Sequence, residues 1–224
     1  MSRKISIPTI VAIRSLAEIE SVPWKNMAGR TKELHVFPED SDFNSFEWRV
    51  SVAEVVASGA FSTFENVDRS IVLLDGDGFD MKLDRERSHS LSEPFSPFSF
   101  AGECHVDVTL RGSGTLDLNL MVRRGVRAGK LVIVTSAEWA PLPCDTALIY
   151  LAKGNAFLSA GSAQENLRPL DFVIFHANRD LPEFRCEPGA VLIAVCVQRK
   201  CHSSDAAISD EPLHRSSREH SVKG

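Results

Sequence analysis

Ser70–Leu83 reads Ser-Ile-Val-Leu-Leu-Asp-Gly-Asp-Gly-Phe-Asp-Met-Lys-Leu, and this stretch decides the fold class. Two apolar runs flank two consecutive Asp-Gly pairs. An Asp-Gly pair between alternating hydrophobic runs is typical of a tight turn that joins two antiparallel strands. We therefore expect strands at 70–74 and 79–83 that form a β-hairpin.

The same alternation continues on both sides of this stretch. In residues 47–56, Trp48, Val50 and Val52 share one face of a predicted strand, whereas Arg49 and Ser51 share the other. Short helical turns are expected only at 15–19, capped by Ser15, and at 66–68. Further strands are predicted at 106–110, 116–122, 131–136, 146–152, 156–159, 172–175 and 191–198.

These patterns predict an all-β protein with very little helix. About a dozen strands exceed what one small barrel needs, so we expect two β-barrels in one chain. The division is expected between Gly102 and Gly129, with an N-terminal barrel at about 5–110 and a C-terminal barrel at about 111–200 of a folded region 1–201. Residues 202–224 are polar and are predicted to form a disordered tail.

Charge and cysteine usage restrict the partners and the compartment. The net charge is −5 and there is no basic run, which argues against a nucleic acid or an anionic membrane surface as partner. No apolar segment reaches the length of a membrane span, and the N-terminus lacks the features of a signal peptide. The expected location is the cytoplasm, and an exposed strand edge could pair two copies as a homodimer.

The cysteines are scattered, odd in number and without a C-x-x-C motif, which favours reduced thiols over a disulfide framework. In particular, Cys196 and Cys201 are expected not to be joined. The five positions are Cys104, Cys144, Cys186, Cys196 and Cys201.

No motif indicates a metal, a cofactor or a nucleophile. Two histidines one residue apart on a strand would point to the same side and could share a metal ion, but His35, His89, His105 and His176 are dispersed. There is no Gly-x-Ser-x-Gly motif, and acidic residues beside Gly76 and Gly78 would repel a phosphate. We therefore expect no metal and no cofactor.

The sequence offers more residues suited to ligand binding than to catalysis. Arginine and lysine beside hydroxyl and amide groups suit a carboxylate, and a tryptophan offers a flat apolar wall. The alternatives stay open: the Trp24 loop would be a surface loop, and Arg49 would form a structural salt bridge with Glu33 or Glu54. The candidate ligand-binding residues are Trp24, Lys25, Asn26, Thr31, Glu33, Arg49, Ser51, Asn119 and Met121.

Several blocks of residues resemble one known family. Pro23-Trp24-Lys25-Asn26-x-x-Gly29-x-Thr31-x-Glu33 is followed by Phe46-x-Trp48-Arg49-x-Ser51-x-Ala53, by Gly59-x-Phe61-Ser62-x-Phe64-x-x-Val67-Asp68-Arg69 and by Asp117-Leu118-Asn119-Leu120-Met121-x-Arg123-Arg124-Gly125. In this order and spacing, over residues 5–199, the chain resembles the HutD/Ves family. It departs from the family at Met27 and Ala28, where small residues are usual, and at Leu118, where phenylalanine is common.

This resemblance implies a double-stranded β-helix fold of the bicupin type. It also implies a protein that moderates histidine utilisation by binding a small carboxylate metabolite, such as urocanate or formylglutamate, rather than by catalysis. It favours the pocket role of the Trp24 loop and Arg49, and it places the strand of Asn119 and Met121 beside that pocket. Two alternatives remain: a metal-free or unusual-metal cupin enzyme, an isomerase or hydrolase with Glu33 or Glu54 as general base, and a Ves-like stress-response protein.

Overall fold

A computed structural model describes residues 6–143, 145–176 and 180–200, which form strands almost throughout. Within these ranges the helical structure consists of one short 3-10 turn, η1 (Leu16–Glu18), so no helix there could cross a membrane. As expected, Ser15 caps this turn, because its Oγ accepts a hydrogen bond from the Ala17 amide at 3.4 Å. The predicted all-β class is confirmed.

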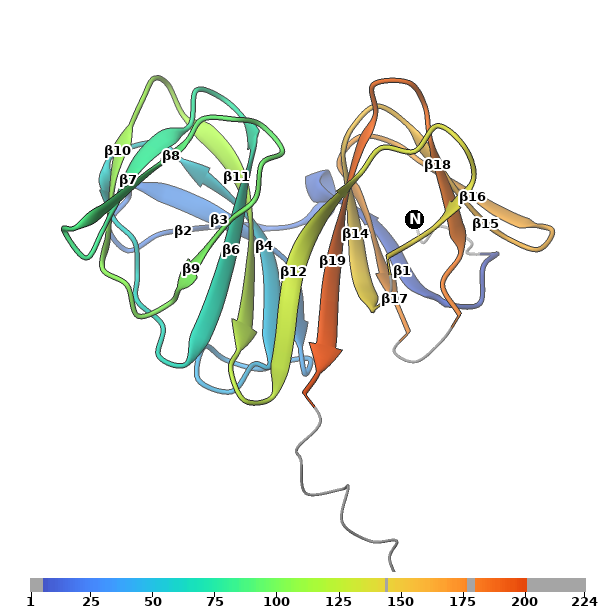
Figure 1. The fold of residues 1–224 in the computed structure, drawn as a ribbon, viewed down its shortest axis with the longest axis horizontal. Helices are drawn as coiled ribbons and strands as arrows, with labels where there is room; N and C mark the ends of the chain where they lie inside the picture. The colour runs from blue at the N-terminus through green and yellow to red at the C-terminus, as the bar shows by residue number, and fades with distance from the viewer. Residues whose placement is uncertain (1–5, 144, 177–179, 201–224) are drawn as a thin grey trace, which may run out of the picture.

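The chain forms two halves that lie side by side (Figure 1). The N-terminal half consists of a six-stranded sheet that faces a four-stranded sheet. The strands of the six-stranded sheet are, in spatial order, β2 (Ser21–Pro23), β3 (Gly29–Phe37), β4 (Trp48–Val55), β11 (Thr115–Arg123), β6 (Val67–Asp75) and β9 (Phe98–Ala101). Those of the four-stranded sheet are β5 (Gly59–Ala60), β10 (Val106–Leu110), β7 (Phe79–Leu83) and β8 (Arg87–Leu91).

The C-terminal half repeats this arrangement with a five-stranded and a four-stranded sheet. The five-stranded sheet contains β1 (Ile10–Ser15), β17 (Asp171–Phe175), β14 (Thr146–Lys153), β19 (Val191–Arg199) and β12 (Arg127–Val134). The four-stranded sheet contains β13 (Ala140–Pro141), β18 (Glu183–Cys186), β15 (Ala156–Ala160) and β16 (Ala163–Leu167).

The two halves pack through the outer faces of their larger sheets. One apolar cluster joins Trp48, Val50 and Leu118 of the six-stranded sheet to Tyr150 and Ile193 of the five-stranded sheet. Since these side chains are at most 5% exposed, the contact between the halves is a hydrophobic core and not a polar domain boundary.

By sheet membership, the strands change halves between Arg123 and Arg127, which is after residue 110 and within the interval from Gly102 to Gly129. Strand β11 lies between β4 and β6 in the N-terminal half, and the chain leaves this half for β12 after Arg123. Strand β1 belongs to the C-terminal half, where it pairs with β17. Each half therefore contains a strand whose pairing partners are distant in the sequence.

The expected hairpin at 70–83 was wrong. Strand β6 pairs with β11 and β9, whereas β7 pairs with β10 and β8, so the Asp-Gly turns carry the chain from one sheet to the other. Gly76 and Gly78 have φ values of +93° and +73°, which favour glycine. A Cβ at Gly78 would lie 1.8 Å from the Leu91 carbonyl oxygen. The sequence correctly predicted a sharp turn at Gly76 and Gly78, but the strands on either side of it pair with other strands and not with each other.

The second expected helical turn, at 66–68, was also wrong. Strand β6 begins at Val67, and Asn66 has a φ of 59°, so the backbone turns sharply before it becomes extended. The predicted tail, Cys144 and Cys201 lie outside the described residues. Cys104 and Cys186 are buried free thiols, and Cys196 is buried.

Candidate functional site

Three adjacent strands of the six-stranded sheet carry polar side chains on the face that looks into the N-terminal half. The apolar residues of β4 and β11 that alternate with them face the other half, as the period of two requires. All five polar residues are between 2% and 9% exposed. We call them the polar cluster: Arg49 and Ser51 on β4, Arg69 on β6, and Asp117 and Asn119 on β11.

Strand register places the cluster in rows. Met121 on the central strand is opposite both Arg49 and Arg69, so the two arginines are separated by one intervening strand, with about 10 Å between their Cα atoms. In the next row, Asn119 is opposite Ser51. The two guanidinium groups thus flank the same central strand and face the same interior.

Arg69 is the most enclosed of these groups. Its Nη1 donates to the Ser62 carbonyl at 3.3 Å and its Nη2 donates to Asn119 Oδ1 at 3.4 Å, but its buried Nε has no hydrogen-bond partner among the described residues. Burial lowers the pKa of Arg69 to about 10; nearby Asp117 opposes this shift and Arg49 adds to it. The guanidinium therefore stays charged near neutral pH with one donor unmatched.

Aromatic rings enclose the Arg69 guanidinium. The rings of Phe61, Phe64 and Phe100 have centroids 5.5, 5.7 and 4.9 Å from its Cζ, within the range of cation–π attraction. These rings exclude water and hold the cation, so they stabilise a charge that burial alone would disfavour.

Asp117 is the acidic counterpart of Arg69. The residue is 2% exposed, and within the described chain its Oδ2 has no hydrogen-bond partner. Burial raises its pKa to about 7, although the positive charge of Arg69 opposes this rise. This carboxyl group therefore titrates near neutral pH, in the same interior as two arginines.

Arg49 forms the ion pair that was considered as its structural alternative. Its Nε lies 2.5 Å from Glu33 Oε2, and Glu33 is half exposed at the edge of the cluster. Glu54 is exposed, and its neighbours Ala53 and Val55 take the inward positions of β4. A second contact covers Arg49 from outside, because the Phe43 ring lies 5.0 Å from its Cζ.

The Trp24 loop contributes an aromatic ring beside the polar cluster, whereas its polar side chains make no hydrogen bond to the cluster within the described residues. Trp24 donates from Nε1 to Thr31 Oγ1 at 2.7 Å, and its ring meets the Phe61 ring edge to face at 5.9 Å. Asn26 stabilises the turn itself, since its Oδ1 accepts from the Ala28 amide at 3.1 Å. Lys25 is exposed and makes no hydrogen bond or ion pair within the described ranges.

The structure therefore brings together most of the candidates, but in two groups. Glu33, Arg49, Ser51, Asn119 and Met121 lie on adjacent strands around the cluster, whereas Trp24 and Thr31 reach it through Phe61. Arg69 and Asp117 were missed as site residues. Their signal was present in the sequence, because each is a charged residue on the inward-facing parity of its strand: Arg69 is in line with Ile71, and Asp117 is in line with Asn119.

The donor set of the cluster does not fit a transition-metal ion. It contains two guanidinium groups, which cannot be ligands, one carboxylate and no imidazole. Over residues 6–143, 145–176 and 180–200, no group of three or more His, Cys, Asp and Glu side chains could hold a metal. Two guanidinium groups suit an anion better than a metal cation.

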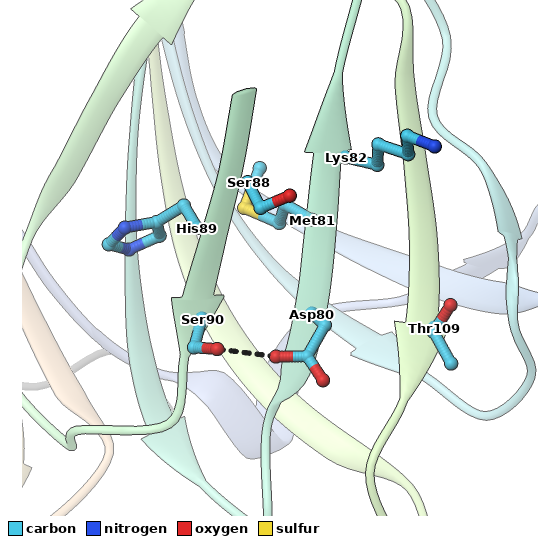
Figure 2. Close-up of a pocket in the computed structure, with 7 residues that line it drawn as sticks. All are labelled: Asp80, Met81, Lys82, Ser88, His89, Ser90 and Thr109. Carbon is cyan, nitrogen blue, oxygen red and sulfur yellow. Dashed lines mark hydrogen bonds between the residues drawn. The ribbon is translucent and has the colours of Figure 1, made fainter. Parts of the chain in front are cut away.

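A separate depression of about 290 Å³ lies on the outer face of the four-stranded sheet of β5, β10, β7 and β8 (Figure 2). Asp80 is already paired there: Ser90 Oγ donates to Asp80 Oδ1 at 2.5 Å, and Arg111 Nε donates to the same oxygen at 3.1 Å. It is lined by Asp80, Met81, Lys82, Ser88, His89, Ser90 and Thr109. Because the charged groups there are exposed or half exposed to water, which screens them, the buried cluster is the better candidate site.

Comparison with known proteins identifies relatives over most of the chain. A Pseudomonas putida protein described as an uncharacterized 21.2 kDa protein in the hutC 3′ region is 31% identical over 161 residues, which cover 71% of this chain and 84% of the relative. Protein Ves of Cronobacter sakazakii is 40% identical over 133 residues, covering 52% of this chain and 71% of that protein.

Solved structures show the same fold. HutD from Pseudomonas fluorescens SBW25 superimposes with a TM-score of 0.72 at 23% identity, covering 85% of this chain and 99% of that one. Oxalate decarboxylase of Bacillus subtilis, a cupin-fold protein, superimposes with a TM-score of 0.56 at 9% identity, covering 87% and 78%. The model of the HutD protein family matches residues 16–193. This chain therefore belongs to the HutD family.

Proposed function

We propose that this protein binds a small carboxylate metabolite, of the urocanate or formylglutamate class, inside its N-terminal half, and that it moderates histidine utilisation by sensing that metabolite. The single observation that carries the proposal is Arg69, a 6% exposed arginine whose Nε donor is unmatched within the described ranges. A buried donor without an acceptor destabilises the fold, so such a group calls for an acceptor.

A carboxylate would satisfy both arginines. One of its oxygens would accept from Arg69 Nε, and the other would face the terminal nitrogens of Arg49, for which the structure gives no hydrogen bond in the described chain. An anion between the two would also reduce the mutual repulsion through which Arg49 lowers the pKa of Arg69. Charge-assisted bonds of this kind are the strong ones in proteins.

The aromatic rings suit the remainder of such a ligand. Phe61, Phe64 and Phe100 surround Arg69, and Trp24 extends this wall beyond Phe61. A planar imidazole or amide would pack between these rings, while the apolar walls keep water from the ion pair.

One observation favours catalysis as the second candidate. Asp117, with its pKa raised to about 7, would suit a group that exchanges a proton near neutral pH. An isomerase or hydrolase acting on a similar acid would use Asp117 in the role that the sequence suggested for Glu33 or Glu54. Binding is preferred because the cluster contains no imidazole that could activate the Ser51 hydroxyl beside this carboxyl group.

The test is calorimetric titration of the full chain with urocanate, formylglutamate, histidine and glutamate. At least one acid should bind the wild type, and Arg69→Met should bind it about tenfold to a hundredfold more weakly, because a charge-assisted hydrogen bond contributes roughly 1.5–3 kcal/mol. Arg111→Met, which removes an exposed arginine paired with Asp80, is the matched control.

Circular dichroism should show that both variants remain folded. Failure of every acid to bind, or equal affinity in wild type and Arg69→Met, would contradict the proposal. Turnover of a bound acid that Asp117→Asn abolishes would establish the enzymatic alternative.

A further inference from the structure

The loop between β3 and β4 carries two phenylalanines with opposite environments. Phe46 is fully buried, in contact with Val67 and Met121. Phe43, three residues earlier, is 56% exposed, which is unusual for a large aromatic side chain. One loop thus has an anchored ring and an unanchored ring.

The main chain of this loop is firmly held. Asp42 Oδ1 accepts from the amides of Asn44 and Ser45, each at 2.9 Å. Arg123 binds the same loop from β11, because its Nε donates to the Phe46 carbonyl at 2.8 Å and its Nη2 donates to the Phe43 carbonyl at 3.2 Å. The main chain at Phe43 is therefore anchored by hydrogen bonds, whereas its ring is exposed.

The Phe43 ring lies at the outer side of the polar cluster. It is 5.0 Å from Arg49 Cζ and its centroid is 5.6 Å from that of Phe64. Phe64 belongs to the loop between β5 and β6 and lies 5.7 Å from Arg69 Cζ. Two rings from two loops thus meet over the two arginines, one ring above each.

We propose that Phe43 is the gate of the polar cluster: its side chain swings on a fixed loop and controls the access of small anions to Arg49 and Arg69. The gate serves the proposed binding function and rests on it for its ligand. Exposed side chains change rotamer within nanoseconds, and a ring that is more than half exposed has few apolar contacts to lose when it turns. Phe64 is more enclosed and would form the fixed side of the opening.

Chemical labelling of arginine tests the gate without any metabolite. Full-length wild type, Phe43→Ala and Phe43→Trp are treated with phenylglyoxal, and the labelled arginines are quantified by mass spectrometry of chymotryptic peptides. Labelling of Arg49 should be several-fold faster in Phe43→Ala and slower in Phe43→Trp. Arg111, exposed on the outer face of the other sheet, should react equally in all three proteins.

An Arg49 labelling rate that is unchanged in Phe43→Ala would overturn the gate, and so would a rise that Arg111 shares, since that would indicate general loosening. Val11→Ala, which truncates another exposed apolar residue on the C-terminal half, is the matched control and should leave the rate at Arg49 unchanged. Because no acid is present, these outcomes are independent of whether any carboxylate binds.

Discussion

The interiors of the two halves differ although their architecture is the same. In the C-terminal half, the inward residues of the five-stranded sheet are apolar and fully buried, as Ile149, Leu151, Val173 and Leu192 illustrate. In the N-terminal half, the corresponding face of the six-stranded sheet carries the polar cluster. Two sheets that face each other can therefore enclose either a hydrophobic core or a set of charges.

Buried carboxyl groups are satisfied to different degrees in the two halves, although the buried Thr9 Oγ1 of the C-terminal half also has no hydrogen-bond partner among the described residues. In the C-terminal half, Glu165 accepts from the Ser6 amide at 2.6 Å and from its hydroxyl at 2.7 Å, and Thr146 donates to the Pro143 carbonyl at 2.6 Å. In the N-terminal half, Arg69 Nε and Asp117 Oδ2 have no partner among the described residues. Unmatched buried groups lower stability, so the N-terminal half combines a stability cost with the capacity to bind.

The largest effect is expected from a cavity in the C-terminal half. Leu151→Ala should lower the free energy of unfolding by about 2–5 kcal/mol, because it removes a fully buried side chain from a packed core. Urea denaturation measures the change, with Val11→Ala as an exposed control that should stay within about 0.5 kcal/mol. At temperatures where Leu151→Ala is folded, its affinity for the bound acid should equal that of wild type. A loss of affinity would contradict the view that the N-terminal half binds the acid independently of packing in the C-terminal half.

A pH effect should distinguish the N-terminal half. Asp117 keeps its proton up to about pH 7 in the folded protein, whereas a free carboxyl loses it near 3.8. Between these values the folded state binds the additional proton, so this group makes unfolding easier as pH rises, by about 1.4 kcal/mol per unit. Asp117→Asn removes this term, and its stability relative to wild type should rise with pH across that window.

Paired urea denaturation series of wild type and Asp117→Asn at pH 4, 5, 6 and 7 provide the measurement. The difference between the two proteins isolates Asp117 from the other carboxyl groups. A constant difference across the series would show that Asp117 is ionised throughout, and the contrast between the two interiors would then be smaller than the geometry indicates.

The smallest changes in ligand affinity are expected from replacing two other cations that were predicted from the sequence to belong to the site. Arg49→Ala should weaken binding of the best acid, but by less than Arg69→Met, because Glu33 already occupies the Arg49 Nε. Lys25→Ala should leave the affinity within about twofold, since Lys25 is exposed and any ion pair it forms is screened. Titration calorimetry measures the affinity of both variants, Arg49→Ala and Lys25→Ala, for the acid. An equal loss in both variants would move the site outward, from the cluster to the Trp24 loop.

Part of the candidate site was predictable from alternation alone. The shared parity of Arg49 with Ser51 predicted one polar strand face, and the register places the candidates Asn119 and Met121 directly beside it. Asp117 shares the parity of Asn119, whereas Arg69 shares the parity of the inward-facing Ile71. They were not selected because a single charged residue in an apolar run is as compatible with a strand end as with a buried site, and only the neighbouring strands distinguish these cases.

The sequence by itself determined the all-β class, the cap at Ser15, the sharp turns at Gly76 and Gly78, and which side chains share a face, because these depend on local backbone preferences and on the period of a strand. Only the tertiary structure decided that β1 joins the distant half, that the Asp-Gly turns connect two sheets rather than a hairpin, and that Arg69 faces Arg49 across β11. Strand pairing depends on hydrogen bonds and packing between segments far apart in the chain, and local sequence does not encode the identity of those partners.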